Sequence, residues 1–229
     1  MKAKLLAAAA IVTFMIPAVC AAAPIRPGAY MSGFIGVTVP NDTTATTDDF
    51  IANSTFNDKV EFDPGINIGM TGGYDFGYLR LEGELSYKHS EMKNITDQSD
   101  NFRFRNVDGN LAALALMFNS FVDLHNNSIL TPYFGGGIGF ATLYLSDTFG
   151  TDTRGGIVSR DQLYVNDSDS VFAYQVGGGV EIALNRELSL DLGYRYFGTS
   201  TARFDSSFDQ STKLKFESHN ATVGFRLKF

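Results

Sequence analysis

Few residues of this 229-residue chain have the types and spacing that catalysis or metal binding requires. His89, Ser90 and Glu91 are consecutive, and these three residue types occur together in catalytic sites. Neighbours on a strand point to opposite faces, however, so consecutive residues cannot form a catalytic set there. His125 and His219 are far away in the sequence, and no spacing matches a metal site. We therefore predict no catalytic, metal or cofactor site.

Two glycine runs, 135–139 and 177–179, superficially look like phosphate-binding loops. Neither run is followed by the helix and the Lys-Ser/Thr pair that phosphate binding needs. Glycines on strands that line a crowded wall explain both runs better.

A third candidate is the acidic segment 143–170. Its carboxylates lack the ordered spacing of a calcium loop, so a solvated acidic loop is the favoured interpretation. The residues concerned are Asp147, Asp152, Asp161, Asp167 and Asp169.

The remaining charged candidates occupy alternate positions of segments that are otherwise apolar or rich in glycine. They are Arg80, Glu82, Glu84, Glu181, Asp191, Arg195 and Arg226. Alternation with period two is the signature of strands, and it puts all the charges of one segment on one face. The function of these residues therefore depends on how the strands are arranged.

Eight segments carry the strand pattern. The alternation is strongest in 78–88, 172–184, 188–196 and 220–229, and weaker in 29–39, 66–74 and 132–142. Segment 109–121 is apolar on both faces, and a helix is the alternative there because 111–118 contains good helix formers.

The connections alternate in length. Short links fall at 75–77, 123–128 and 185–187, and long polar links at 40–61, 89–106, 143–170 and 198–213. Both ends of the barrel segment fall on the short side. A transmembrane barrel has this asymmetry, with tight periplasmic turns and longer outside loops. The pattern predicts an all-β, eight-stranded antiparallel transmembrane β-barrel.

The apolar face must then point outwards. It would expose too much apolar area in water, whereas lipid accommodates it and closure satisfies every backbone group. The polar face, with its glycines and few large ions, suits the narrow interior of eight strands. Aromatic residues near strand ends are expected to form the interfacial girdle: Tyr30, Tyr74, Tyr78, Tyr87, Tyr196, Phe197 and Phe229.

Inside such a barrel the charged residues must pair, because isolated buried ions cost several kcal/mol each. We expect Glu82, Glu84, Glu181 and Asp191 to meet Arg80, Arg195 and Arg226 in one network. The network would hold the strand register; the alternative is a gate that opens when the pairs exchange.

The first residues read as an export signal. Two lysines precede an apolar run, 5–16, and alanines follow it. The run is shorter than the roughly 20 residues of a membrane-spanning helix. We predict cleavage after Ala22 or nearby, which divides the chain into a signal peptide, 1–22, and an outer-membrane β-barrel domain, 23–229.

Cys20 is the only cysteine. Lipid attachment to Cys20 is a rival reading, but Val19 is a poor neighbour for that processing. If Cys20 leaves with the signal, the exported chain has no disulfide and depends on hydrogen bonds and packing. The formal net charge of −7 argues against nucleic acid as a partner.

Several strand sequences resemble those of the opacity-family porins and related OmpA-type eight-stranded outer-membrane proteins, a group that extends to rickettsial major surface antigens. The matching segments are 28–30 (GAY), 79–87 (LRLEGELSY), 131–139 (TPYFGGGIG), 173–180 (AYQVGGGV), 190–197 (LDLGYRYF) and 224–229 (GFRLKF). The resemblance covers most strands and none of the long loops. It implies the bacterial outer membrane as the location, and it is weakly specific for any activity.

The resemblance also implies that the last strand carries the signal read by the barrel-assembly machinery. Val223, Phe225, Leu227 and the terminal Phe229 occupy its alternating positions. An alternating terminal strand can add edge-on to a partner sheet, although it would also simply close the barrel.

The leading expectation for function is a structural, adhesin-like role through the extracellular loops. A narrow porin for small solutes is the alternative that the family name implies, and a lipid A-modifying enzyme is the third. The expected partners are outer-membrane lipids and lipopolysaccharide, the assembly machinery, and a host, phage or matrix ligand at the loops. The chain is expected to be a monomer without cofactors.

Overall fold

The computed structural model describes residues 27–229 apart from 52, 127, 157 and 207–209. The predicted signal peptide, 1–22, and the lipidation alternative at Cys20 lie outside the described residues. Among those residues, no helix combines the length and the apolar character needed to cross a membrane.

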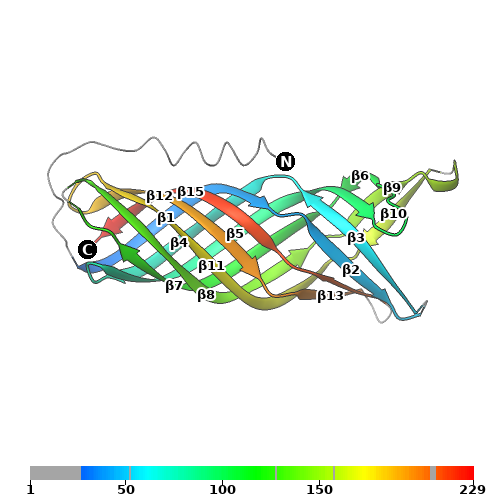
Figure 1. Ribbon diagram of the computed structural model, residues 1–229, viewed down its shortest axis with the longest axis horizontal. Coiled ribbons are helices and arrows are strands. Elements are labelled where there is room, and N and C mark those ends of the chain that lie inside the picture. Colours follow the sequence, from blue (N-terminus) through cyan, green and yellow to red (C-terminus); the bar gives the residue numbers. More distant parts are fainter. Residues whose placement is uncertain (1–26, 52, 127, 157, 207–209) are drawn as a thin grey trace.

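Eight long antiparallel strands form a closed barrel (Figure 1). They are β1 (Gly28–Pro40), β4 (Gly65–Asp75), β5 (Leu79–Asp97), β7 (Asn110–Asp123), β8 (Leu130–Leu145), β11 (Asp167–Ala183), β12 (Leu188–Thr199) and β15 (Glu217–Lys228). Each pairs with its successor in this order, and β15 pairs back with β1. The predicted eight-stranded barrel is confirmed.

Strand β7 occupies the segment whose pattern was ambiguous. It pairs with β5 on one side and with β8 on the other over almost its whole length. The helix alternative for this segment is therefore wrong. Pairing with both neighbouring strands outweighs the local helix propensity of this segment, because the sheet closes only through β7.

Short and long connections alternate as the sequence indicates. The turns at 76–78, 124–129 and 184–187 lie at one end of the barrel, together with the C-terminus (Figure 1). At the first turn Gly77 has a φ of 104°, which favours glycine, and its N–H donates to Asp75 Oδ1 at 2.7 Å. This end is the periplasmic one.

The long connections are not irregular loops, and this corrects the prediction. They contain β2 (Thr43–Asp49), β3 (Ser54–Phe62), β6 (Arg105–Asp108), β9 (Thr148–Asp152), the 3₁₀ turn η1 (Arg154–Gly156), β10 (Ser159–Tyr164), β13 (Ala202–Ser206) and β14 (Gln210–Leu214). We call these elements and their connections the crown. One crown sheet runs β13-β14-β2-β3 and continues into the outer end of β5; a second contains β10, β9 and β6.

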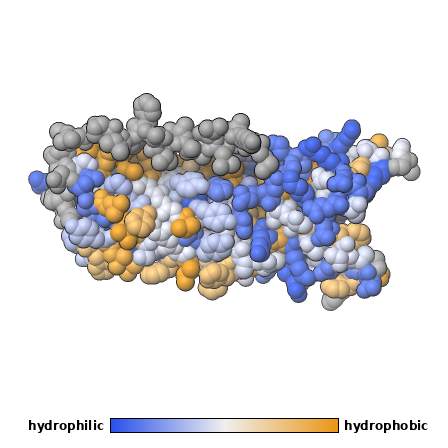
Figure 2. Space-filling view, viewed as in Figure 1, coloured by the Kyte–Doolittle hydropathy of each residue, from blue (hydrophilic) through white to orange (hydrophobic). Residues whose placement is uncertain are grey.

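The apolar face of the barrel points outwards, as predicted. Leu116, Ile138 and Phe140 expose 64%, 58% and 66% of their surface on the outer wall. In the face that Figure 2 shows, the barrel is largely white and orange, and the crown is predominantly blue. The hydrophobic band therefore ends where the crown begins, as a membrane-spanning barrel requires.

Two members of the predicted aromatic girdle are misplaced. Tyr30 and Phe197 are buried inside the barrel, with 2% and 0% of their surface exposed. Both residues occupy the alternate strand positions that face the interior. Their nearness to the strand ends, on which the girdle prediction was based, does not show which face they occupy. The exposed girdle members are Tyr74, Tyr78, Tyr87 and Phe229.

The interior has two different fillings. The periplasmic half is ionic and the outer half is apolar, so the expectation of a polar interior is wrong for the outer half. The apolar core includes Met92, Leu111, Ala113, Met117, Leu143, Val171, Phe197, Leu214 and Phe216. It explains why β7 is apolar on both faces: one face meets lipid and the other this core.

A charge at the middle of the outer wall should destabilise the barrel. Ile138 pairs with Phe118 and lies near the middle of the hydrophobic band. We expect Ile138→Arg to lower the unfolding free energy in lipid vesicles by about 2–4 kcal/mol. Urea titration followed by heat-modifiable electrophoretic mobility measures the loss. Phe56→Arg, at a half-exposed crown position, is the matched control and should change little; equal losses would contradict the assignment of the band.

Candidate functional site: the filled barrel interior

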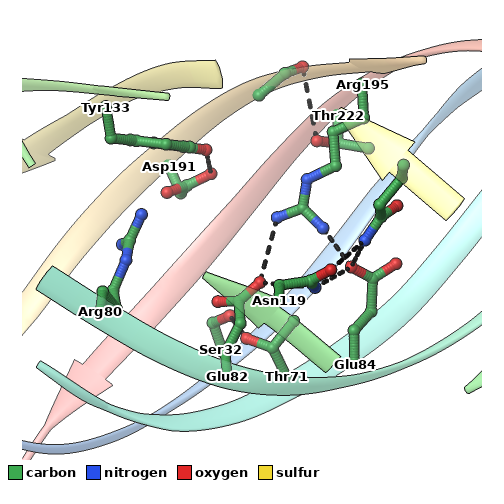
Figure 3. A network of polar contacts seen from close by, with 12 residues as sticks. Ser32, Thr71, Arg80, Glu82, Glu84, Asn119, Tyr133, Asp191, Arg195 and Thr222 are labelled. Carbon is green, nitrogen blue, oxygen red and sulfur yellow. Dashed lines mark hydrogen bonds and ion pairs between the residues drawn. The ribbon is translucent and has the colours of Figure 1, made fainter. Parts of the chain in front are cut away.

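The barrel interior contains two groups of ion pairs that use all seven charged residues singled out from the sequence. In the first group, Arg195 of β12 lies between Glu82 and Glu84 of β5 (Figure 3). Its guanidinium pairs with Glu84 and lies 3.4 Å from Glu82 Oε1. Both carboxylates are almost fully buried. Alternate positions on β5 therefore present two anions to one cation across the lumen.

Neutral side chains complete the first group. Asn119 donates to Glu82 and Glu84 at 3.2 and 3.0 Å. Gln175 donates to Glu84 at 2.8 Å, and Tyr30 donates to Glu82 at 2.7 Å. The carboxylates thus have hydrogen-bond donors as well as a counter-ion, which is the condition under which buried ions are tolerated.

The second group lies nearer the periplasmic end. Arg226 pairs with Glu181 and lies 2.9 Å from Asp191 Oδ2. Arg80 lies 3.7 Å from Glu181 and 3.3 Å from Asp123. Strand register thus joins charges from β5, β7, β11, β12 and β15 across the barrel.

Three members of this group were missed as site residues. Lys228 bridges Asp75 at 3.1 Å and Glu181 at 3.2 Å, and Asp123 faces Arg80. Asp75 and Asp123 had been assigned to turns, although Asp75 has the parity of the polar face of its strand. Asp123 could not be placed because the alternation of β7 leaves its register open.

The lumen beside these groups is nearly filled. A cavity of about 10 Å³ adjoins Glu84, Lys88 and Arg195. A single water molecule needs about 10–15 Å³ of such volume. Farther out, Lys88 lies 4.2 Å from the ring centroid of Phe197, where the apolar core takes over.

Glycines make room for the large interior side chains. A Cβ atom at Gly179 would lie 2.6 Å from the Tyr133 hydroxyl oxygen, which donates to Asp191 at 2.7 Å. A Cβ at Gly137 would overlap the Asn119 side chain. The glycine runs are therefore parts of the wall and not phosphate loops.

The histidines face different surroundings. Ser90 is buried inside the barrel, whereas His89 stacks on Tyr87 with ring centroids 6.4 Å apart. His125 packs edge-on against Tyr78 near the periplasmic end, and Nδ1 of His219 lies 2.7 Å from the hydroxyl of Tyr194. Within the described part of the chain, no group of three or more His, Cys, Asp or Glu side chains could hold a metal ion.

The acidic segment has structural partners. Asp167 and Asp169 accept hydrogen bonds from the backbone N–H groups of Asp205 and Arg203, each at 2.8 Å. These carboxylates cover the free edge of β13. Elsewhere in the crown, hydrogen bonds from Arg154 hold the pKa of the Asp152 carboxyl below its usual value.

A closed eight-stranded barrel with an apolar outer wall, an ionic interior and short turns at one end defines an integral protein of the bacterial outer membrane. The family model described as outer membrane protein beta-barrel domain matches residues 6–229, and the chain belongs to this family.

Individual relatives agree with this assignment. Outer membrane protein PagN of Salmonella typhimurium is 24% identical over 228 residues, which cover 93% of each chain. An uncharacterized protein of Brucella abortus is 28% identical over 200 residues, covering 76% of this chain and 68% of that protein. The crystal structure of OprG from Pseudomonas aeruginosa superposes with a TM-score of 0.57 at 16% identity, covering 88% of this chain and 96% of that one. The last similarity shows the fold alone.

Breaking the first ionic group should cost much more than breaking a surface pair. Arg195→Met removes the ion-pair partner that the buried Glu82 and Glu84 share, and we expect a loss of about 3–5 kcal/mol in urea titrations. The triple variant R195M/E82Q/E84Q should recover part of this loss, because the unpaired charges are gone. Arg160→Met breaks an exposed pair with Asp108 and should cost less than about 1 kcal/mol. Similar losses in the single variants would contradict a buried network.

Proposed function

We propose that this outer-membrane protein acts by binding other molecules through its crown, as a structural, adhesin-like surface protein that neither conducts solutes nor catalyses a reaction. The observation that carries the proposal is the filled interior. If the lumen offers no path and no reactive site, the crown is the part of the molecule left to contact partners.

The two interior fillings argue against the narrow porin. Six strands contribute ion-paired side chains to the periplasmic half, and the apolar core occupies the outer half. A solute would have to displace both, including Phe197 and Phe216, which pack ring against ring at 6.2 Å. A gate that opens by exchanging ion pairs would clear only the ionic half.

The crown suits a binding role because its strands are continuous with the wall. β3 pairs with β5 beyond the hydrophobic band, from Phe62 opposite Met92 to Asp58 opposite Asp97. At the far end, Phe50, directly after β2, exposes 65% of its surface. An exposed aromatic side chain on a platform of hydrogen-bonded strands loses little entropy when it binds a partner.

The positions of the histidines argue against the lipid A-modifying enzyme. Such chemistry needs a base within hydrogen-bond reach of its nucleophile. His89 and Ser90 lie on opposite sides of the wall. We propose that the chain works as a monomer without a cofactor, in contact with outer-membrane lipids and lipopolysaccharide, and that a host, phage or matrix molecule binds the crown.

The decisive test of the filled interior is a liposome-swelling assay. Purified protein should produce no swelling with small sugars or amino acids, while a general porin in parallel vesicles swells them. Uptake that scales with the amount of monomer would overturn the proposal in favour of the porin.

The binding role is tested on cells. A non-adherent bacterial strain should gain adhesion to epithelial cells or matrix-coated surfaces when it displays the full chain. The gain should be lost when a two-residue Asn-Gly turn replaces 43–60, which removes most of the β2–β3 hairpin. The matched control shortens the periplasmic turn 184–187 instead. Unchanged adhesion without the hairpin would contradict a role for this part of the crown.

We also propose that Val223, Phe225, Leu227 and Phe229 form the C-terminal assembly signal. Their side chains lie on the outer face of β15, and Phe229 exposes 73% of its surface. Its N–H donates to the Ala29 carbonyl at 2.9 Å, so the residue also contributes to closure.

Deletion of Phe229 should lower the amount of folded protein in the outer membrane several-fold, as measured by surface proteolysis and heat-modifiable mobility. Leu184→Ala, at an exposed apolar position of the same end, is the control. Normal membrane yield without Phe229 would remove the targeting role.

A further inference from the structure

The crown contains a concave site lined mainly by basic and amide side chains. It is a hollow of about 510 Å³, lined by Lys93, Asn94, Arg103, Phe104, Arg105 and Asn106. A volume of this size lies in the range of small-molecule and saccharide sites. Phe104 connects the hollow to the apolar core, whereas none of the lining residues belongs to the ionic groups of the interior.

Two neighbouring segments build the hollow. The chain after β5 turns back, so that Arg103 pairs with Thr96 in an isolated bridge and the Phe104 N–H donates to the Ile95 carbonyl at 3.0 Å. Phe104 is 8% exposed and forms part of the floor. Asn106 has a positive φ of 48°, a conformation that asparagine tolerates better than most residues.

A β-bulge in β5 directs two of its side chains towards the hollow. The register with β3 shifts between Glu61 opposite Asn94 and Phe62 opposite Met92, which leaves Lys93 as the extra residue. Met92 and Ile95 both stay buried on either side of it. The bulge therefore turns Lys93 and Asn94 to the outside together, a common use of bulges at binding sites.

The charge of the hollow is only partly neutralised, by Asp63 and by Glu61, to which Asn94 donates at 2.8 Å. Lys93 Nζ lies 2.6 Å from Asp63, but Arg103 has only Asn94 as a polar side-chain partner, at 3.1 Å. Among the described residues, neither Arg103 nor Arg105 has a carboxylate within 4.0 Å. Two exposed guanidiniums without a direct ion pair stand out in a chain with a formal net charge of −7.

The chemistry of these groups selects the ligand. Guanidinium forks match the oxygens of phosphate bidentately, and an amide such as that of Asn106 donates to sugar hydroxyls. The Asn94 amide already donates to Glu61 at 2.8 Å and holds Arg103 in place. A phosphorylated saccharide satisfies both features.

The distance of the hollow from the membrane centre indicates where its ligand comes from. Tyr87 lies at the outer limit of the hydrophobic band on β5, and Lys93 follows six residues later. At about 3.4 Å per residue and a tilt near 45°, Lys93 lies roughly 14 Å farther from the membrane centre. That places the hollow above the acyl chains, at the level of the sugars that the surrounding leaflet carries.

We propose that this hollow binds a phosphate on the saccharide part of lipopolysaccharide in the surrounding leaflet, held by Arg103 and Arg105. The inference deepens the proposed binding role of the crown, since it names one partner and its site. Bound lipopolysaccharide would fix the crown relative to the membrane surface and leave its far end free.

The test uses the full exported chain, refolded in zwitterionic nanodiscs, and titration with rough lipopolysaccharide that has a phosphorylated inner core. The R103Q/R105Q variant should bind at least about tenfold more weakly, because two charge-assisted hydrogen-bonding groups are lost. The control variant R160Q/R203Q removes two crown arginines outside the hollow and should stay within about twofold of the original chain. Dephosphorylated lipopolysaccharide should bind the original chain and R103Q/R105Q equally weakly.

Several outcomes would overturn the inference. The inference is wrong if R103Q/R105Q binds lipopolysaccharide as tightly as the original chain does. It is also wrong if R160Q/R203Q loses as much affinity as R103Q/R105Q, or if removing the phosphates from lipopolysaccharide leaves its affinity unchanged. Binding of heparin at the hollow without binding of lipopolysaccharide would refute the proposed source. If R103Q/R105Q failed to fold, R103K/R105K replaces it, since lysine keeps the charge but loses the bidentate fork. Adhesion lost with the β2–β3 hairpin is measured separately, so failure of one proposal is distinguishable from failure of the other.

Discussion

In the hydrocarbon of a membrane, a backbone N–H or C=O without a partner costs several kcal/mol, and this requirement shapes the whole molecule. Strands meet it only when the sheet closes, which here happens through the pairing of β15 with β1. Once the ring is closed, one face of every strand meets lipid and the other a lumen too narrow to stay open. The apolar wall, the interior glycines and the adjacent strand ends all follow from closure.

A narrow lumen still has to be filled, and this chain does so in two ways. Within the periplasmic half, charged side chains are tolerated because each carboxylate has a counter-ion, and Glu82 and Glu84 have hydrogen-bond donors as well. Beyond Lys88 the interior becomes a hydrophobic core like that of a soluble protein. The outer half needs this core because the crown above it stands in water, where burial of apolar surface stabilises folding.

The crown shows what a strand does after it leaves the membrane. On β5 the inner face changes from Arg80 and Glu84 to Met92, and the bulge at Lys93 then shifts the alternation by one residue. The outer face changes from leucine and tyrosine to charged residues over the same distance. One continuous strand therefore contacts lipid along its first part and reaches the proposed binding hollow in the crown at its outer end.

The sequence by itself determined the eight membrane strands, their inverted faces, the order of short and long connections and seven of the ten charged residues in the ionic groups. These features depend on parity along a strand, which can be read from residues two apart. Only the tertiary structure decided which charges meet and that β2, β3, β13 and β14 are strands. Those outcomes depend on register between strands far apart in the chain and on burial beyond the membrane. The physical reason is that alternation assigns a side chain to a face, whereas its partner is set by the strand packed beside or across from it.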